Sequence, residues 1–267
     1  MTQATTNDYS PFDHVAGDRK KGLLLICDHA TATIPPAYNK LGLGEDQLSR
    51  HIAYDIGAKD VTLALAKALD VPVILSNFSR LLIDPNRGHD DPTLMMRISD
   101  GALIPENAKA DSAEVERRRR LYHAPYHQRV EEELLAIEAA RDGQAAFIFS
   151  VHSFTPNWRG TPRPWEITIL WDSDPRLPKP LLEGLRADPA LTVGDNVPYD
   201  GALKNDCMFQ HGTKRGRAHA LVELRQDLIV SREGAEDWAT RLAPLLKEQF
   251  NNPILNKHTF YPSRTEQ

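Results

Sequence analysis

The sequence predicts an α/β fold: a mixed, mostly parallel β-sheet flanked by helices. Three short apolar runs, at residues 23–27, 145–151 and 218–222, have the length and composition of buried strands. Amphipathic stretches at 56–69 and 234–250 have helical spacing and separate or follow these runs. Strands that alternate with helices are typical of a sheet whose strands mostly run in one direction.

Other elements complete this alternation. Further strands are predicted at residues 73–75 and 165–171, and further helices at residues 45–50 and 178–187. The longest helical stretch is 112–140, in which Pro125 predicts a kink or a break because proline has no N–H to donate. Residues 88–110 show no clear periodicity and are expected to form a long excursion from the core.

Composition and organisation indicate an ordinary globular enzyme or binding protein. Residues 1–20 are expected to be an irregular lead-in, and residues 21–267 a single domain, since no repeat or linker divides them. The net charge of −5 gives no support for a nucleic-acid partner. No apolar run approaches membrane-spanning length and the polar start lacks the pattern of a secretory signal, so we expect a cytoplasmic protein.

Chemically useful side chains stand at the ends of the three apolar runs. The first run is followed by Asp28 and His29, the second by His152, and the third by Glu223. Because ligands bind at the carboxyl ends of parallel strands, these side chains are expected to share one edge of the sheet. Two histidines and a carboxylate are a typical set of zinc ligands, and a further glutamate is the usual base beside such a metal.

The carboxylate ligand has two candidates, Asp55 and Asp28. Adjacent residues of a strand point in opposite directions, so Asp28 and His29 can share one metal only if the strand has ended. We therefore favour Asp55, which precedes a predicted helix and has the alternative role of capping it. Glu223 closes an apolar strand, where burial raises the proton affinity of a carboxylate; its alternative is an ion pair with Arg225.

A dense polar segment follows the strand at 73–75. It contains Arg80, Asn86 and Arg87, and a guanidinium group offers the paired donors that a carboxylate accepts. Arg225, which shares a strand face with Glu223, is a further candidate for binding substrate. These four residues are the predicted substrate-binding set.

Several blocks together resemble the N-formylglutamate amidohydrolase family. In chain order the blocks are residues 27–30, 51–58, 79–87, 122–127, 150–154, 195–199 and 222–229. The resemblance extends from about residue 23 to about residue 250. It implies a fold like that of the zinc carboxypeptidases (the phosphorylase/hydrolase-like class), with a mixed eight-stranded sheet.

The resemblance also implies a function. By analogy with carboxypeptidase sites, His29 and His152 would bind Zn²⁺, Glu223 would be the general base, and the substrate would be an N-acyl amino acid such as N-formyl-L-glutamate. Ala32 stands where those enzymes carry their carboxylate ligand, so Asp55 or Asp28 must replace it. The alternatives are a carboxylate-binding protein without catalysis, or a metal-free hydrolase using Ser153 or Cys27.

Overall fold

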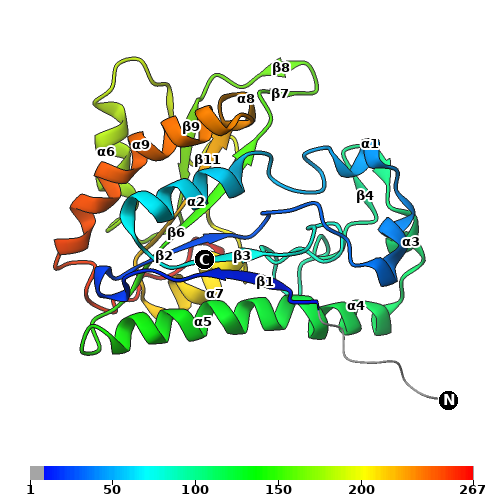
Figure 1. Cartoon of the computed structure of the whole chain (residues 1–267), viewed down its shortest axis with the longest axis horizontal. Helices are drawn as coiled ribbons and strands as arrows, with labels where there is room; N and C mark the ends of the chain where they lie inside the picture. Colours follow the sequence, from blue (N-terminus) through cyan, green and yellow to red (C-terminus); the bar gives the residue numbers. More distant parts are fainter. Residues whose placement is uncertain (1–8, 267) are drawn as a thin grey trace.

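The computed structural model describes residues 9–266 and is organised around one seven-stranded sheet (Figure 1). The strand order is β1-β3-β2-β6-β11-β9-β10. The bounds are β1 (Phe12–Val15), β2 (Leu23–Cys27), β3 (Val73–Ser76), β6 (Phe147–Phe154), β9 (Ile167–Leu170), β10 (Val193–Asp195) and β11 (His219–Arg225). The four central strands β3, β2, β6 and β11 are parallel, whereas β1 and β9 run antiparallel to their inner neighbours. The predicted mixed, mostly parallel sheet is confirmed, with seven strands in place of eight.

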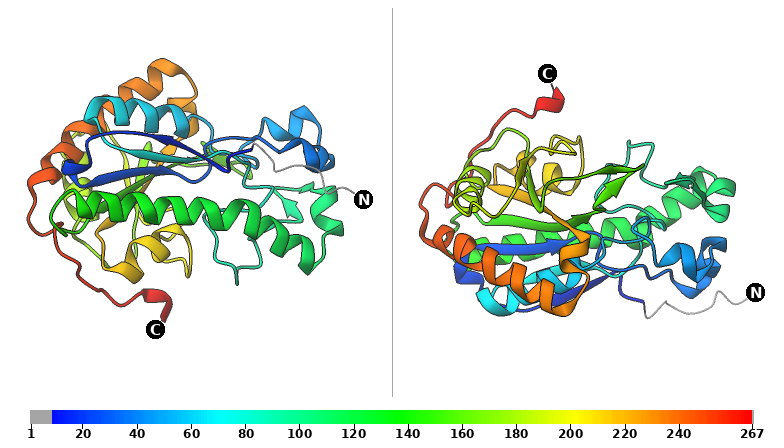
Figure 2. Two further views of the ribbon diagram at one scale, coloured as in Figure 1. Left: turned by 60° about the horizontal axis from the view of Figure 1, so that its bottom comes forward. Right: turned by 90° about the horizontal axis from the view of Figure 1, so that it is seen from above.

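Helices cover both faces of the sheet. Figures 1 and 2 show α2 and α9 on one face and α5 on the other. The helices are α1 (Glu45–Leu48), α2 (Ala58–Leu69), α3 (Pro105–Lys109), α4 (Ser112–Arg118), α5 (Ala124–Ala139), α6 (Pro178–Arg186), α7 (Cys207–His211), α8 (Gln226–Ile229) and α9 (Arg232–Glu248). Small hairpins are formed by β4 (Ile98–Ser99) with β5 (Ala102–Leu103), and by β7 (Asn157–Trp158) with β8 (Thr161–Pro162). In the part of the chain described here, no helix is long and apolar enough to cross a membrane.

Two predictions about secondary structure are corrected by the structure. The helix does not break at Pro125: its backbone stays helical from α4 through a π-helical segment (Arg119–His123) into α5, and Pro125, in the first turn of α5, coincides only with this local change in hydrogen bonding. The expectation of an irregular segment over residues 1–20 is wrong where it can be checked, since Phe12–Val15 pairs with β3 as an edge strand. This four-residue strand carries Asp13 and His14, so its sequence has no apolar run to reveal it. Residues 1–8 lie outside the described part.

The two faces of the central strands pack into different cores. In β2, Leu23, Leu25 and Cys27 join the core beneath α2 and α9, whereas Leu24 and Ile26 join the core beneath α5. The same alternation continues in β6 and β11, because successive side chains of a strand point to opposite faces. Polar residues at the ends of these strands whose side chains point to the α5 face therefore come together at one edge of the sheet.

Candidate active site

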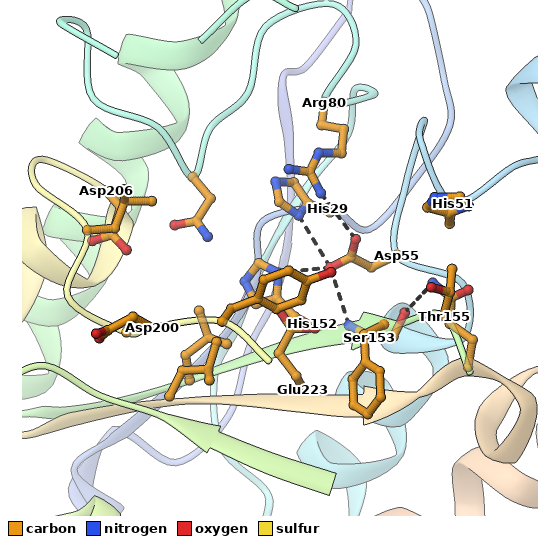
Figure 3. Close-up of a pocket in the computed structure, with 18 of the residues that line it drawn as sticks. His29, His51, Asp55, Arg80, His152, Ser153, Thr155, Asp200, Asp206 and Glu223 are labelled. Carbon is orange, nitrogen blue, oxygen red and sulfur yellow. Dashed lines mark hydrogen bonds and ion pairs between the residues drawn. The ribbon is translucent and has the colours of Figure 1, made fainter. Parts of the chain in front are cut away.

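The candidate site is a pocket of about 370 Å³ at the carboxyl ends of β2, β6 and β11 (Figure 3). His152 and Glu223 are direct neighbours in the β6–β11 register, so their side chains project from the same face of the sheet. Seven of the eight predicted site residues line the pocket: His29, Asp55, Arg80, Asn86, Arg87, His152 and Glu223. The tertiary structure thus brings together residues separated by up to 194 positions in the chain (223 − 29).

Asp55 lies between the two histidines. Its Oδ2 atom is 3.3 Å from Nδ1 of His29 and 2.8 Å from Nδ1 of His152 (Figure 3). All three side chains are buried, and their ligand atoms lie within 4.8 Å of one another. Two imidazole nitrogens and a carboxylate oxygen that converge in this way form a group that could hold a metal ion.

The opposite nitrogen of each imidazole faces another carboxylate. Nε2 of His29 lies 2.7 Å from Oδ1 of Asp84, and Nε2 of His152 lies 3.2 Å from Oδ2 of Asp28. Because an ionised carboxylate can only accept, a proton on each Nε2 donates to it and each Nδ1 is left to face the site. Carboxylates behind metal-binding histidines act in this way: they fix the tautomer and the ring orientation.

His152 is held between two carboxylates, and its proton affinity reflects this. Burial lowers the pKa of His152, but hydrogen bonds with Asp28 and Asp55 outweigh it and raise that pKa to about 10. The pKa of Asp55 is correspondingly held far below its usual range, since the charge of His29 and the bond to His152 overcome burial. The position between Asp55 and the two rings therefore favours positive charge, which a proton or a metal ion can supply.

Asp28 occupies a different place from Asp55. It follows the last residue of β2 and turns toward α5, where its Oδ1 accepts from the Tyr126 hydroxyl at 2.8 Å and its Oδ2 from Ser150 Oγ at 3.2 Å. His29, one residue later, turns toward Asp55 because the strand has ended at Cys27. Of the two carboxylates that the sequence left open, Asp55 is the one between both rings and Asp28 lies behind His152.

Backbone contacts hold Asp55 in place, and a glycine follows it two residues later. Asp55 donates its backbone N–H to the carbonyl of His29 at 3.0 Å, and its carboxylate also accepts from the backbone N–H of Ser153 at 3.3 Å. The N-cap of α2 is Gly57, with φ of +81°, so Asp55 is not the cap of this helix. A Cβ at position 57 would lie 2.3 Å from the carbonyl oxygen of Ile229.

We expect Gly57→Ala to lower the free energy of unfolding by about 2–4 kcal/mol, because it combines an unfavourable φ with a backbone clash. Gly143→Ala is the matched control: its φ is also +81°, but an added Cβ there meets nothing within 4 Å, so we expect a loss of about 1 kcal/mol. Urea unfolding of both variants measures the difference. Equal losses would show that the contact with Ile229 does not matter.

Glu223 borders the pocket and forms no ion pair with any of residues 9–266. Burial raises the pKa of Glu223 to about 7, while His152 and Arg80 lower it and Asp55 adds to the increase. The ion pair with Arg225, the alternative suggested by the sequence, does not form. Arg225 instead bonds Asp227 at 2.8 Å and Glu166 at 3.3 Å. Glu223 is therefore available to exchange a proton with a molecule in the pocket.

The predicted substrate-binding residues divide into three positions. Arg80 faces the group of His29, Asp55 and His152: its Nε and Nη2 donate to Oδ2 of Asp84 at 3.1 and 2.8 Å, and its Nη1 is 3.6 Å from Oδ1 of Asp55. Asn86 and Arg87 form another part of the pocket wall. Arg225 does not line the pocket, because Glu166 and Asp227 hold its guanidinium elsewhere, and we withdraw it as a substrate-binding residue.

Other residues in or beside the pocket escaped the sequence analysis. Asp84 orients both His29 and Arg80, and its place in the polar segment after β3 was the signal that could have identified it. Asp206 caps α7 and lines the pocket, where burial raises its pKa to about 7. His51, Trp158 and Tyr199 come from irregular segments and the small β7–β8 hairpin, whose geometry sequence patterns do not specify.

Comparison with known proteins identifies the family. A model of the family described as N-formylglutamate amidohydrolase matches residues 21–230. The chain belongs to this family. Its reaction class is therefore amide hydrolysis. A comparison with curated proteins found no match for this amidohydrolase.

Solved structures show the same fold. A gene product from Agrobacterium tumefaciens is 33% identical to this amidohydrolase, with a TM-score of 0.82 over 90% of this chain and 94% of the other. N-formylglutamate amidohydrolase from Ralstonia eutropha is 19% identical, with a TM-score of 0.67 over 91% of this chain and 97% of the other. The extent of both matches shows that the described fold is common to the three proteins.

Proposed function

We propose that this amidohydrolase is zinc-dependent and cleaves the amide of an N-acyl amino acid, with N-formyl-L-glutamate as the expected substrate and formate and glutamate as products. The convergence of His29, Asp55 and His152 beside Glu223 is the observation that carries the proposal. Family membership supports amide hydrolysis, and the name of the family supports the choice of substrate.

The donor set fits zinc. Two imidazole nitrogens and one carboxylate oxygen are the usual composition of a catalytic zinc site, which keeps a further position open toward the substrate. The carboxylates of Asp84 and Asp28 behind the rings match the support that such ligands require. When bound, zinc would polarise the amide carbonyl and increase the acidity of a water molecule.

Glu223 is proposed to move the proton in this reaction. Its carboxylate takes a proton from the attacking water, the oxygen of that water bonds to the acyl carbon, and the carbon–nitrogen bond then breaks. The same carboxyl group returns the proton to the leaving nitrogen, which departs as the amine of glutamate. Glu223 suits both steps because its pKa of about 7 makes the protonated and ionised forms similarly accessible near neutral pH.

Arginines of the pocket are proposed to bind and orient the substrate. Arg80, next to Asp55, is placed to donate to the oxygen of the reacting amide. Arg87 lies farther along the wall and donates from Nη1 to the carbonyl of Asn86 at 2.7 Å, which fixes its guanidinium. Together with the side chain of Asn86, Arg87 is placed to hold a carboxylate of the substrate.

If Arg87 binds the substrate and Arg225 does not, their substitutions should differ in their effect on KM. We expect Arg87→Ala to raise KM for N-formyl-L-glutamate about 10- to 100-fold, because a charge-assisted hydrogen bond to a carboxylate is lost. Arg225→Ala serves as the control and should change KM less than about threefold, since Arg225 contacts Glu166 and Asp227 outside the pocket. Initial rates over a range of substrate concentrations measure both. If the two variants have the same KM, Arg87 does not bind substrate.

A panel of N-acyl amino acids tests the proposed function. The zinc-loaded protein is expected to release formate and glutamate from N-formyl-L-glutamate faster than it cleaves N-acetyl-L-glutamate or N-formyl-L-leucine. Release of product from none of these compounds, combined with calorimetric binding of glutamate, would instead support a carboxylate-binding protein without catalysis.

A further inference from the structure

Two imidazoles lie behind the part of the pocket wall that carries Asn86 and Arg87. Nε2 of His127 is 2.9 Å from the carbonyl oxygen of Pro85, and Nε2 of His123 is 2.9 Å from the carbonyl oxygen of Arg87. Both histidines are buried. Because a carbonyl oxygen only accepts, each imidazole donates its N–H to this segment.

The segment at residues 84–87 is held in part by these hydrogen bonds from the imidazoles. It belongs to no helix or strand, yet it carries Asp84 behind His29, and Asn86 and Arg87 on the pocket wall. The α7 side supplies one further bond, from the backbone N–H of Cys207 to Oδ1 of Asn86 at 3.2 Å. Its own N–H groups bond within the loop, Asp84 to the carbonyl of Leu94 and Asn86 to Oδ1 of Asp84, whereas the bonds to the carbonyl groups of Pro85 and Arg87 tie the segment to His127 and His123.

A chain of hydrogen bonds restricts His127 to the tautomer that donates to Pro85. Its Nδ1 lies 2.9 Å from Nε2 of His211, whose Nδ1 lies 3.0 Å from Oε2 of Glu131. Burial lowers the pKa of His127 well below its usual range, and His123 and His211 lower it further, so the ring is neutral. With its proton on Nε2, the Nδ1 of His127 must accept from His211.

Glu131 completes this chain as a carboxylate. Burial would raise the pKa of Glu131, but hydrogen bonds from His211 and Arg217 lower it to about 2. Since Glu131 accepts from Nδ1 of His211 while Nε2 of the same ring donates to His127, His211 carries both protons. The ion pair between His211 and Glu131 thus sets the direction of every hydrogen bond up to Pro85.

A metal ion would be a different explanation for part of this cluster. His127, Cys207 and His211 offer ligand atoms within 4.8 Å of one another. The facing nitrogens of His127 and His211, 2.9 Å apart, are however already joined by the hydrogen bond of this chain. Burial and the neighbouring Asp28 also raise the pKa of the Cys207 thiol well above its usual range, which disfavours the thiolate that zinc requires.

We propose that His123 and His127 are positioning residues for substrate binding, which hold the carbonyl groups of Arg87 and Pro85 and thereby aim Asn86 and Arg87 into the pocket. The inference rests on the proposed function for its substrate, but not for its geometry. It assigns a role to His123 and His127, two buried histidines that do not belong to the group of His29, Asp55 and His152.

Three variants test this role. His127→Phe keeps a ring without the N–H, His127→Gln restores a donor near the position of Nε2, and His219→Phe is the control. His219 is an equally buried imidazole 2.9 Å from a carbonyl, that of Arg217, at the end of β11 remote from Glu223. We expect His127→Phe to raise KM for N-formyl-L-glutamate about tenfold with kcat changed less than about threefold, and His127→Gln to recover most of the loss. An unchanged KM, or an equal effect of His219→Phe, would overturn the proposal.

Two measurements decide the geometry without turnover. Hydrogen exchange of a peptide covering residues 84–94 should be faster in His127→Phe than in His127→Gln or His219→Phe, while exchange in the β-sheet stays the same. In the unaltered zinc-loaded protein, ¹⁵N NMR should show a neutral His127 protonated on Nε2 and a doubly protonated His211. Binding of a second equivalent of zinc that is lost in Cys207→Ser would contradict the proposed chain of hydrogen bonds. So would a His127 that is protonated on Nδ1. If the parent hydrolyses no N-acyl amino acid, the proposed function fails, while these two measurements still decide the positioning role.

Discussion

Glu223→Gln is expected to lower kcat by about a thousandfold while KM or Kd for N-formyl-L-glutamate changes less than about threefold. The amide of glutamine keeps the size of the side chain and can still hydrogen-bond, but it cannot take a proton from water or return one to the leaving nitrogen. The side chain borders the pocket beside His152 and lacks an ion pair with Arg225, so the substitution removes little besides proton transfer. Steady-state kinetics together with calorimetric binding separate these two effects.

Glu166→Gln is the matched control for this variant. Glu166 also flanks β11 and bonds Arg225, but its carboxylate lies outside the pocket and accepts from the backbone N–H of Thr192, which glutamine can still bond. We expect its kcat to stay within about threefold of the parent. A Glu223→Gln variant that retains full turnover would show that another group is the base.

Metal removal is expected to have a comparable effect. Dialysis against a chelator should reduce turnover at least about a thousandfold, and one equivalent of Zn²⁺ should restore it, because the metal supplies the polarisation that the amide requires. Metal content is measured by atomic spectroscopy on the same samples that are assayed. Full activity in a chelated sample free of divalent metal would refute the zinc proposal.

A pair of aspartate variants distinguishes a ligand from the group behind it. Asp55→Ala removes the oxygen that faces both imidazoles and should abolish stoichiometric zinc binding. Asp28→Asn changes the group behind His152, together with its bonds to Tyr126 and Ser150, and leaves the three ligand atoms in place, so we expect zinc affinity to fall about 10- to 100-fold with the site still able to load. Loss of zinc in Asp28→Asn together with retention in Asp55→Ala would reverse the assignment. Unfolding curves of both variants confirm that each is folded when assayed.

Much of the site could be predicted because strands place their residues by a simple rule. The apolar runs revealed β2, β6 and β11, and parallel strands present their carboxyl ends at one edge, so His29, His152 and Glu223 followed from position alone. Arg80, Asn86 and Arg87 followed as a polar cluster after the next strand. The same reasoning misplaced Arg225, since its guanidinium is long enough to reach Glu166, just before the neighbouring strand β9, and so leave the pocket.

The edge strand β1, in contrast, could not be predicted from the sequence. Its four residues have no apolar pattern, and they become a strand because β3 offers an unpaired edge whose N–H and C=O groups need partners. Such an element depends on its neighbour more than on its own composition. The β7–β8 hairpin that brings Trp158 to the pocket is as short, and its position was equally inaccessible to pattern analysis.

Local sequence alone determined that this chain folds as a mostly parallel α/β protein, and that two histidines and a glutamate close its central strands. Only the tertiary structure decided between Asp55 and Asp28, because that choice depends on how the chain turns after β2 and before α2. It also decided that Asp84 supports His29 and that His127 faces Pro85, since these contacts join residues 55 and 42 positions apart. Periodicity describes which face of an element a side chain occupies, whereas the partner on that face is fixed by packing between distant segments.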